Sequence, residues 1–325
     1  MLFVTLLFLT TQGQERQSDY IPVSQYWKEH NILQHLDVSI TLGTTGVGFD
    51  LASPIGDYLQ VRAGYAFMPH IHHNMTFGIQ SDQIKDDVSF NNMADAIENF
   101  TGYRIHNQVV MVGVPTINNV KLLVDVFPFK NNRHWHFTAG AYWGPSQIAK
   151  AYNRTEDMPS LMAVSTYNHM YEKAIVREPL VSVNYNGNDF YFPDDPELKD
   201  EIKNIFLSYG RMGVRIGNRV SDGSPYIMEP DEDSMVKAKA RSNSLKPYLG
   251  FGYGGRLFKN NDRYTVSFDC GAMFWGGSPS VVTHDGTDLV NDVRDIGGKV
   301  GAYVDLIKFF KVYPVLNVRL TKTIF

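Results

Sequence analysis

An alternation of apolar side chains with polar or small ones constrains this chain most strongly, because it recurs in several separate segments. One segment spans residues 58–68, where the apolar set is Leu59, Val61, Ala63, Tyr65 and Phe67. Residues 246–258, 263–275 and 297–308 repeat the pattern. Because successive side chains of a β-strand point to opposite faces of a sheet, each segment predicts a strand with two unlike faces.

Weaker copies of the alternation extend this prediction over most of the chain. They cover residues 38–52, 72–80, 104–114, 120–127, 135–143, 207–219 and 312–325, and a hairpin is expected in residues 180–192. We therefore predict an all-β chain that forms a transmembrane antiparallel β-barrel of about 12 strands, with a range of roughly 10 to 14. Asp195-Pro196 is a helix-start pair, and residues 285–296 carry apolar side chains at helical spacing, so short helices are expected in the long loops.

The composition of the two strand faces indicates which one meets lipid. The apolar face carries bulky groups such as Tyr65, Phe251 and Phe268, whereas the other face is rich in Gly and Ala with scattered charges. A water-exposed sheet surface would favour Thr, Lys and Glu over Gly, which weakens a strand. A crowded lumen, by contrast, needs small residues beside long charged ones. The pattern therefore favours a membrane barrel with its apolar face outward.

Two tryptophans support this orientation. Trp135 and Trp143 share one face of a predicted strand, and at roughly 3.3 Å per residue they lie about 26 Å apart along it. After allowance for strand tilt, this is close to the spacing of the two aromatic girdles around an outer-membrane barrel. We therefore predict that both are girdle residues. The alternative is a pair of core tryptophans in a soluble sandwich.

Charged residues on the opposite face are the candidate site residues, because they would line the lumen. They are Asp50, Arg62, Asp125, Arg211, Arg215, Arg256, Asp269, Lys299, Asp305 and Arg319. Both signs occur, and an unpaired charge sealed away from water is costly. Ion pairs across the lumen are therefore expected.

The first residues have the character of an export signal. Residues 1–10 form an apolar run too short to span a bilayer as a helix, which needs about 20 residues. Small residues at Thr11 and Gly13 precede a cleavage point before Gln14. We therefore expect a signal peptide in residues 1–13, an N-terminal extension in residues 14–37 and a single β-barrel domain in residues 38–325. A buried N-terminal strand is the alternative for the first segment.

Charge and cysteine content argue against several function classes. The formal net charge is −4, so the chain lacks the basic character of proteins that bind nucleic acid. Cys270 is the single cysteine, which rules out an internal disulfide and a multi-cysteine metal site. No G-x-S-x-G motif marks a nucleophile, and the histidines of residues 70–73 and 134–136 are expected to be exposed or interfacial. We therefore predict no enzymatic activity, no metal and no cofactor.

The signal-like start, the alternating strands and the terminal aromatic residue Phe325 together resemble bacterial outer-membrane β-barrel proteins. Residues 59–69 (LQVRAGYAFMP) and 268–277 (FDCGAMFWGG) look like barrels of Bacteroidetes in particular. The resemblance implies a monomer in the outer membrane, surrounded by lipid and recognised by the barrel-assembly machinery through Phe325. The sequence departs from the usual assembly signal, because Phe325 shares its strand face with Thr323 and Thr321 rather than with apolar residues.

The predicted function is that of a narrow channel, a small-molecule transporter or a structural membrane protein. A barrel of about 12 strands has little bore beyond what side chains fill, since open channels appear near 16 to 18 strands. Low or no porin-like conductance is therefore expected. The alternatives are a secreted soluble β-barrel that binds an apolar ligand and an outer-membrane hydrolase with its site at the rim.

Overall fold

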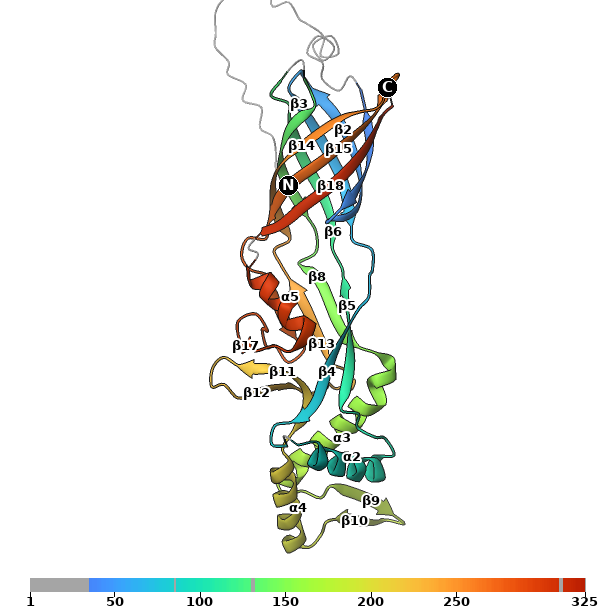
Figure 1. Cartoon of the computed structure of the whole chain (residues 1–325). Helices are drawn as coiled ribbons and strands as arrows, with labels where there is room; N and C mark the ends of the chain where they lie inside the picture. The colour runs from blue at the N-terminus through green and yellow to red at the C-terminus, as the bar shows by residue number, and fades with distance from the viewer. Residues whose placement is uncertain (1–34, 85, 130–131, 310–311, 325) are drawn as a thin grey trace, which may run out of the picture.

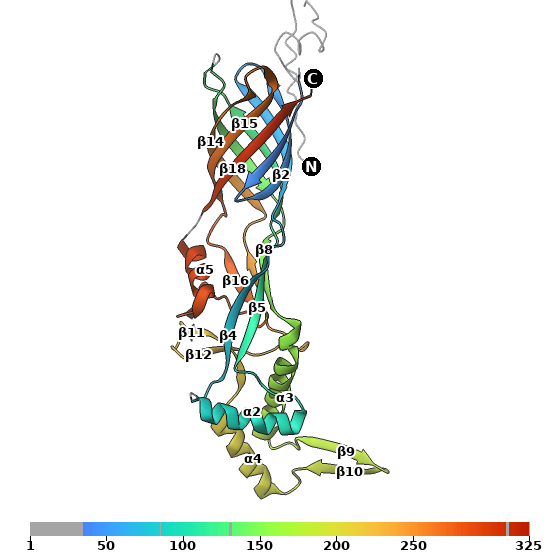
Figure 2. The same ribbon diagram turned by 45° about the vertical axis from the view of Figure 1, so that its right-hand side comes forward.

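The structure, a computed structural model, describes residues 35–84, 86–129, 132–309 and 312–324. Figure 1 shows an elongated molecule with a closed β-barrel at one end and a second sheet with its helices at the other. Figure 2, turned about the long axis, shows the same succession of the two parts. The predicted signal peptide and Phe325 lie outside the described residues.

Eight antiparallel strands close the barrel in the order β1-β18-β15-β14-β7-β6-β3-β2. Their bounds are β1 Asp37–Gly43, β2 Gly46–Ile55, β3 Leu59–Phe67, β6 Asn118–Val126, β7 Trp135–Trp143, β14 Leu245–Phe258, β15 Asn261–Phe274 and β18 Val312–Thr323. The first strand pairs with the last, from Asp37 opposite Thr323 to Gly43 opposite Asn317, so the sheet closes on itself. The barrel thus has eight strands instead of the predicted number of about 12.

Most of the remaining alternating segments form a second antiparallel sheet, so residues 38–325 do not make a single barrel. The strand order is β12-β11-β4-β5-β8-β13-β16, and β17 pairs with β11. The bounds are β4 His73–Ser81, β5 Gln108–Pro115, β8 Gln147–Asn153, β11 Met212–Arg219, β12 Pro225–Met228, β13 Lys237–Arg241, β16 Ser280–Thr283 and β17 Val293–Arg294. The segments predicted at residues 72–80, 104–114 and 207–219 contribute strands here rather than to the barrel.

The helices lie at the end of the molecule that holds the second sheet (Figure 1). They are α2 Asp87–Thr101, α3 Met158–Ile175, α4 Pro196–Tyr209 and α5 Gly298–Phe309, with a short 3₁₀ turn at Thr155–Asp157. As predicted, α4 starts at the Asp195-Pro196 pair, where the Asp195 carboxylate accepts a hydrogen bond from the backbone N–H of Leu198. Residues 297–308 were predicted as a barrel strand and are helix α5 instead, whereas residues 285–296 contain turns and β17 rather than a helix. The predicted hairpin exists as β9 Val181–Tyr185 and β10 Asn188–Phe192, a separate two-stranded sheet.

The connections at the two ends of the barrel differ greatly in length. At the end where β18 finishes, residues 56–58, 127–134 and 259–260 join neighbouring strands. At the opposite end the turn at residues 44–45 is short, but residues 68–117, 144–244 and 275–311 leave the barrel and build the second sheet with its helices (Figure 1). The second sheet is therefore made of insertions that all leave the same end of the barrel.

The second sheet has an apolar core of its own. Val109 of β5 and Val214 of β11 are fully buried in one cluster with Leu161 and Val164 of α3. The side chains between such positions are exposed and charged on β13, where Lys239 is an example. This part of the molecule therefore has the ordinary arrangement of a water-soluble protein, with apolar residues inside and charges outside.

Candidate functional site

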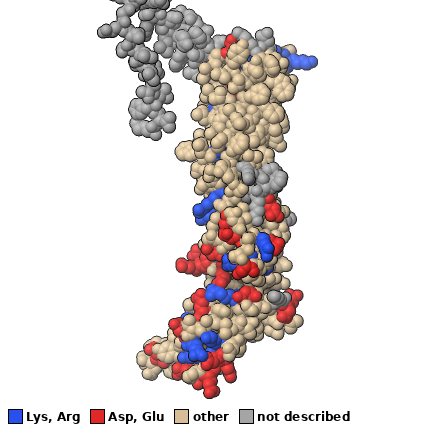
Figure 3. All heavy atoms as spheres, turned by 90° about the vertical axis from the view of Figure 1, so that its left-hand side faces the viewer, with Lys and Arg blue, Asp and Glu red and all other residues tan. Residues whose placement is uncertain are grey.

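The outer wall of the barrel is a belt of exposed apolar side chains. Its members include Val38, Ile40, Leu42, Phe49, Leu51, Tyr65, Val120, Leu122, Phe137, Leu249, Phe251, Tyr253, Phe268, Leu316, Val318 and Leu320. Leu122, for example, is 59 % exposed. Figure 3 shows a wall almost free of charged side chains, which gather instead over the second sheet. Monomeric soluble proteins rarely expose continuous apolar surface on this scale.

Trp135 and Trp143 lie at the two ends of β7 and are both exposed on this wall, with exposed fractions of 44 % and 65 %. Near the end where β18 finishes, the Trp135 ring meets the Tyr253 ring edge to face, with centroids 4.9 Å apart. Trp143 lies at the end next to the second sheet, opposite Leu245 of β14 and Val120 of β6. The apolar belt is thus bordered by a tryptophan at each end of one strand, and neither is a core residue.

Inside the wall, charged side chains fill the middle of the lumen. The Asp125 carboxylate is fully buried and accepts hydrogen bonds from Arg62 at 2.9 Å and from the Thr138 hydroxyl at 2.7 Å. Arg319 reaches the second oxygen of Asp125 at 3.4 Å. Two arginines from β3 and β18 therefore share one carboxylate from β6 across the lumen.

A second carboxylate, Asp269 of β15, extends this network. Its Oδ2 atom lies 3.3 Å from Arg319 Nε and 3.8 Å from Arg62 Nη1. Its Oδ1 atom lies 2.6 Å from Nε2 of His136, which is buried on β7. Five strands thus contribute side chains to a single connected polar network.

A third ion pair lies on β2 and β6. The Lys121 ammonium is 2.8 Å from Asp50 Oδ1, and the Thr41 hydroxyl donates to Asp50 Oδ2 at 2.9 Å. Lys121 and Asp50 are each 2 % exposed. The carboxylates of Asp50, Asp125 and Asp269 are therefore matched by the cations of Lys121, Arg62 and Arg319, which is the condition under which charge is tolerated away from water.

Toward the second sheet, the lumen is closed by apolar and aromatic side chains. Leu123, Tyr142, Tyr248, Met273 and Val315 form one buried cluster, in which each is at most 3 % exposed. The rings of Tyr142 and Tyr248 contact edge to face, with centroids 5.5 Å apart. A barrel of eight strands has an interior just wide enough for its side chains, and here they fill it.

Inward-facing glycines make room for these side chains. A Cβ atom on Gly252 would lie 2.3 Å from the His136 ring, and one on Gly250 would lie 2.2 Å from the Tyr248 hydroxyl. Both distances are far below van der Waals contact. The glycine-rich face predicted to line a crowded lumen does so at these positions.

The end of the barrel where β18 finishes is open to a polar cavity. Its volume is about 670 Å³, and its lining includes Asp37, Gln60, Arg133, His134 and Arg256. Arg319 and His136 of the charge network form its floor. The lumen is therefore a blind vestibule at one end and is filled at the other.

The predicted lumen residues separate into groups in the structure. Asp50, Arg62, Asp125, Asp269 and Arg319 are buried inside the barrel. Arg256 lies at the rim, where it makes an exposed ion pair with Asp262 at 3.0 Å.

The other four lie outside the barrel, so their assignment to the lumen was wrong. Arg211 precedes β11 and Arg215 lies within it, in the second sheet, and Lys299 and Asp305 belong to α5. Hydrogen bonds to Glu229 are the main cause that raises the pKa of Arg211 above its ordinary value. Alternation correctly predicted a strand at β11, but this strand belongs to the second sheet and not to the barrel.

Sequence reasoning missed Lys121, Lys246 and His136, which are also buried in the lumen. Lys121 and His136 have the parity of the predicted inward positions, since Leu122 and Phe137 point outward beside them. That parity was the available signal. The expectation that the histidines are exposed or interfacial fails at His136, because it is buried beside Asp269.

Within the described ranges, no group of three or more His, Cys, Asp or Glu side chains is arranged to hold a metal ion. The same part of the chain contains no helix with the length and apolar character needed to cross a membrane.

No family model matches the chain. A GTP cyclohydrolase 1 type 2 homolog of Mycoplasmopsis pulmonis (strain UAB CTIP) is 24% identical over 185 residues, which cover 50% of this chain and 72% of that protein. Among solved structures, Acinetobacter baumannii CarO2 and CarO give TM-scores of 0.38 and 0.37 at 16% and 18% identity. Each comparison covers 89% of this chain and 98% of the other. These values establish neither a family nor a shared fold, and nothing in them supports the narrower resemblance to Bacteroidetes barrels.

Proposed function

We propose that this protein is a closed outer-membrane barrel that anchors the second sheet at the outer face of the membrane, and that it is not a channel. The observation that carries the proposal is the combination of an apolar wall with a filled lumen in which Asp50, Asp125 and Asp269 are paired with cations. Leu122 and Phe137 point outward on neighbouring strands, while Asp125 and Arg62 are paired inside. Only a lipid surrounding makes this arrangement favourable, because it rewards apolar contact outside and requires that charges be paired inside.

The lengths of the connections suggest an orientation. Bacterial outer-membrane barrels have short turns on the periplasmic side and longer loops outside the cell. Here residues 56–58 and 259–260 are short turns at one end, whereas residues 68–117 and 144–244 leave the other. The second sheet is therefore placed outside the cell by this proposal.

The filled lumen favours an anchor over a transporter. A solute that enters the polar vestibule meets the ion pairs of Arg319 and then the buried cluster around Tyr248 and Met273. Passage would require these side chains to separate and expose unpaired charges, which is costly in a low-dielectric interior. A monomer surrounded by lipid, assembled through Phe325, remains our prediction for its state and partners.

Cys270 offers a direct test of the membrane location. It lies in the described part of the barrel on β15, opposite Phe251 and Leu316, and therefore shares their outward direction. In native outer membranes we expect an apolar maleimide to label Cys270 much faster than a charged maleimide. Equal labelling by both reagents would place the wall in water and favour the soluble alternative.

Orientation is tested with a second cysteine. In a Cys270→Ser background, Asn186→Cys places a thiol at the tip of the β9–β10 hairpin, far from the barrel (Figure 2). On intact cells, a charged maleimide that does not cross the membrane should label this thiol. Labelling only after lysis would show that the second sheet faces the periplasm.

Closure is tested by conductance. In planar bilayers the purified full chain should show no steady current, since eight strands leave no open bore. A large and steady conductance from the unmodified protein would contradict the anchor proposal and restore the channel hypothesis.

A further inference from the structure

The second sheet contains a cavity that the barrel proposal does not use. Its volume is about 420 Å³, within the range of roughly 300–1,000 Å³ that small-molecule sites occupy. It lies between the inner face of the sheet and α5, and the connection that leaves the barrel at Met68 and Ile71 borders it. Its lining is almost wholly apolar, as in most sites that bind small molecules.

The floor of the cavity is a row of small residues that crosses the strands. Gly113 of β5 lies opposite Ala151 of β8, and Ala151 lies opposite Ala238 of β13. A parallel row pairs Ala149 with Ala240. Directly opposed residues of antiparallel strands point to the same face, so these small side chains form a continuous trough. The trough exists because glycine or alanine occupies each of these opposed strand positions.

The ends of the first row are polar, which gives the trough a direction. His73 of β4 lies opposite Gly113, and Thr283 of β16 lies opposite Ala238. The five strands span about 19 Å at roughly 4.8 Å per strand spacing. The Thr283 hydroxyl already bonds Tyr226, Asp285 and the Thr287 carbonyl. Thr283 therefore has no free hydrogen bond to offer a ligand.

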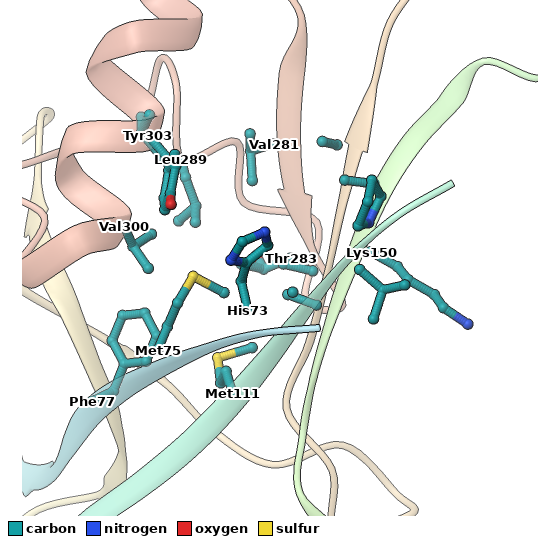
Figure 4. A pocket seen from close by; sticks show the side chains of 18 of the residues that line it. His73, Met75, Phe77, Met111, Lys150, Val281, Thr283, Leu289, Val300 and Tyr303 are labelled. Carbon is teal, nitrogen blue, oxygen red and sulfur yellow. The ribbon is translucent and has the colours of Figure 1, made fainter. Parts of the chain in front are cut away.

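His73 and Tyr303 are the polar groups that remain available. Figure 4 shows the His73 ring above Met75 in the cavity and the Tyr303 hydroxyl beside Leu289 and Val300. Lys150 borders the cavity, but its amine points away and lies 5.5 Å from the centre of the Tyr152 ring. The remaining lining comprises methionines, aliphatic residues, Pro115 and Phe77. An apolar trough with one available polar end matches a molecule that has an apolar chain and a small polar head.

We infer that this cavity binds a single-chain amphiphile of the fatty-acid type, with its chain along the trough and its head at His73 and Tyr303. Helix α5 forms the lid through Val300, Tyr303 and Val304. The volume suits one chain rather than the two chains of an intact phospholipid. The inference does not rest on the membrane location of the barrel, because the cavity is lined by the second sheet, by α5 and by connecting residues such as Met68 and Leu289, and by none of the eight barrel strands.

The test uses the full chain in lipid nanodiscs and a photoactivatable palmitate analogue as probe. Cross-links should map to peptides of β5, β8, β13 or α5, and unlabelled palmitate should abolish them. Weaker competition by hexadecanol than by palmitate would support a carboxylate head group, whereas equal competition would overturn the fatty-acid assignment. If an intact two-chain phospholipid competes better than palmitate, the single-chain inference is overturned. Labelling confined to the outer wall of the barrel would overturn the inference.

Val281 and Val282 give a matched pair of variants, because they are neighbours on opposite faces of β16 and only Val281 lines the cavity. Val281→Trp should reduce labelling about tenfold, since bulk placed in the trough excludes the chain. Val282→Trp should leave labelling unchanged. Ala151→Leu is a milder variant that fills the middle of the trough, and it serves if Val281→Trp does not fold. Unchanged labelling in the folded trough variants would overturn the inference.

The head position is tested separately. His73→Phe should weaken palmitate binding about fivefold, by loss of a favourable hydrogen bond, while the chain still labels the same peptides. If His73→Phe and Tyr303→Phe together leave affinity unchanged, the assignment of the head to this end is wrong.

Discussion

The barrel and the second sheet use the same alternation of side chains but place opposite faces inside. In β18 of the barrel, Arg319 is buried while Val318 and Leu320 are exposed. In β13 of the second sheet, Ala240 is buried while Lys239 is exposed. One molecule therefore contains two antiparallel sheets with reversed interiors.

Alternation alone therefore does not define which face of a sheet becomes the interior. What separates the two sheets is the content of the less apolar face. In the barrel that face combines glycine with a few charges that neutralise one another, such as Asp125 and Arg62. In the second sheet it carries lysines and arginines, and the residues directly opposite Lys239 on the neighbouring strands are Lys150 and Val282. Charges that pair with one another across a barrel are typical of its lumen. Charges that point into solvent are typical of a water-exposed sheet face.

The largest expected effect comes from breaking the buried network. Asp125→Ala leaves Arg62 and Arg319 without their shared carboxylate in a closed lumen, so the full chain in lipid vesicles should lose about 3–5 kcal/mol of unfolding free energy. Urea titration followed by tryptophan fluorescence measures the loss.

A variant that breaks an exposed ion pair in the second sheet serves as the control for Asp125→Ala. Glu229→Ala removes a partner of Arg211, whose side chain is 35 % exposed and keeps Glu172 at 3.2 Å. This change should cost about 1 kcal/mol or less. Equal losses of unfolding free energy in the two variants would mean that the lumen is as accessible to water as the surface of the second sheet.

The next effect concerns the wall. Leu122→Arg should destabilise the barrel by roughly 2–4 kcal/mol if the position lies near the bilayer midplane. Val220→Arg, at a position of similar exposure beside β11, should be nearly neutral because it faces water. Folding yield into vesicles and urea midpoints measure both. A tolerated Arg at Leu122 would place the wall in water.

The individual barrel strands were predictable from the sequence, because alternation is local. Residues 58–68 and 263–275 form β3 and β15 with apolar side chains such as Tyr65 and Phe268 outward. The partition between two sheets was not predictable, because β3 pairs with β6 across an insertion of residues 68–117. Pairing over such separations leaves no mark in a short segment.

Helix α5 shows a second limit. Val300 and Val304 alternate with their neighbours, but they are also four residues apart, which suits one face of a helix. Short segments that satisfy both periods are ambiguous, and here packing against the second sheet decides. The apolar cavity was equally hidden, because its floor of glycine and alanine residues is assembled from β5, β8 and β13.

A smaller effect is expected from glycine-to-alanine substitutions that test how tightly side chains pack in the two interiors. Gly250→Ala places a Cβ atom 2.2 Å from the Tyr248 hydroxyl and 2.9 Å from the carbonyl oxygen of Cys270, so it should cost about 1–3 kcal/mol. At Gly113 a Cβ atom would lie 3.0 Å from the terminal methyl group of Met75, which can move. Gly113→Ala should therefore be nearly neutral. Comparable losses at both positions, measured by urea unfolding, would show that the two interiors are equally packed.

The smallest expected effect is an acid sensitivity confined to the second sheet. Burial acts to raise the pKa of Asp285, but hydrogen bonds from Thr283, Thr287 and Tyr226 outweigh it and hold that pKa below its ordinary value. Because the folded-state pKa is the lower one, ionised Asp285 stabilises the fold above the unfolded pKa of about 3.9, and the contribution is lost as pH falls. Asp285→Asn should thus remove about 1 kcal/mol or less near neutral pH and flatten the acid limb.

Hydrogen exchange of amides in β12 and β16, corrected for intrinsic rates between about pH 3 and pH 6, measures this contribution separately from the barrel. The amides of β15 and β18 should respond identically in the variant and the unmodified protein, since Asp285 belongs to the other sheet. A matching change in the barrel amides would show that the two sheets unfold as one unit.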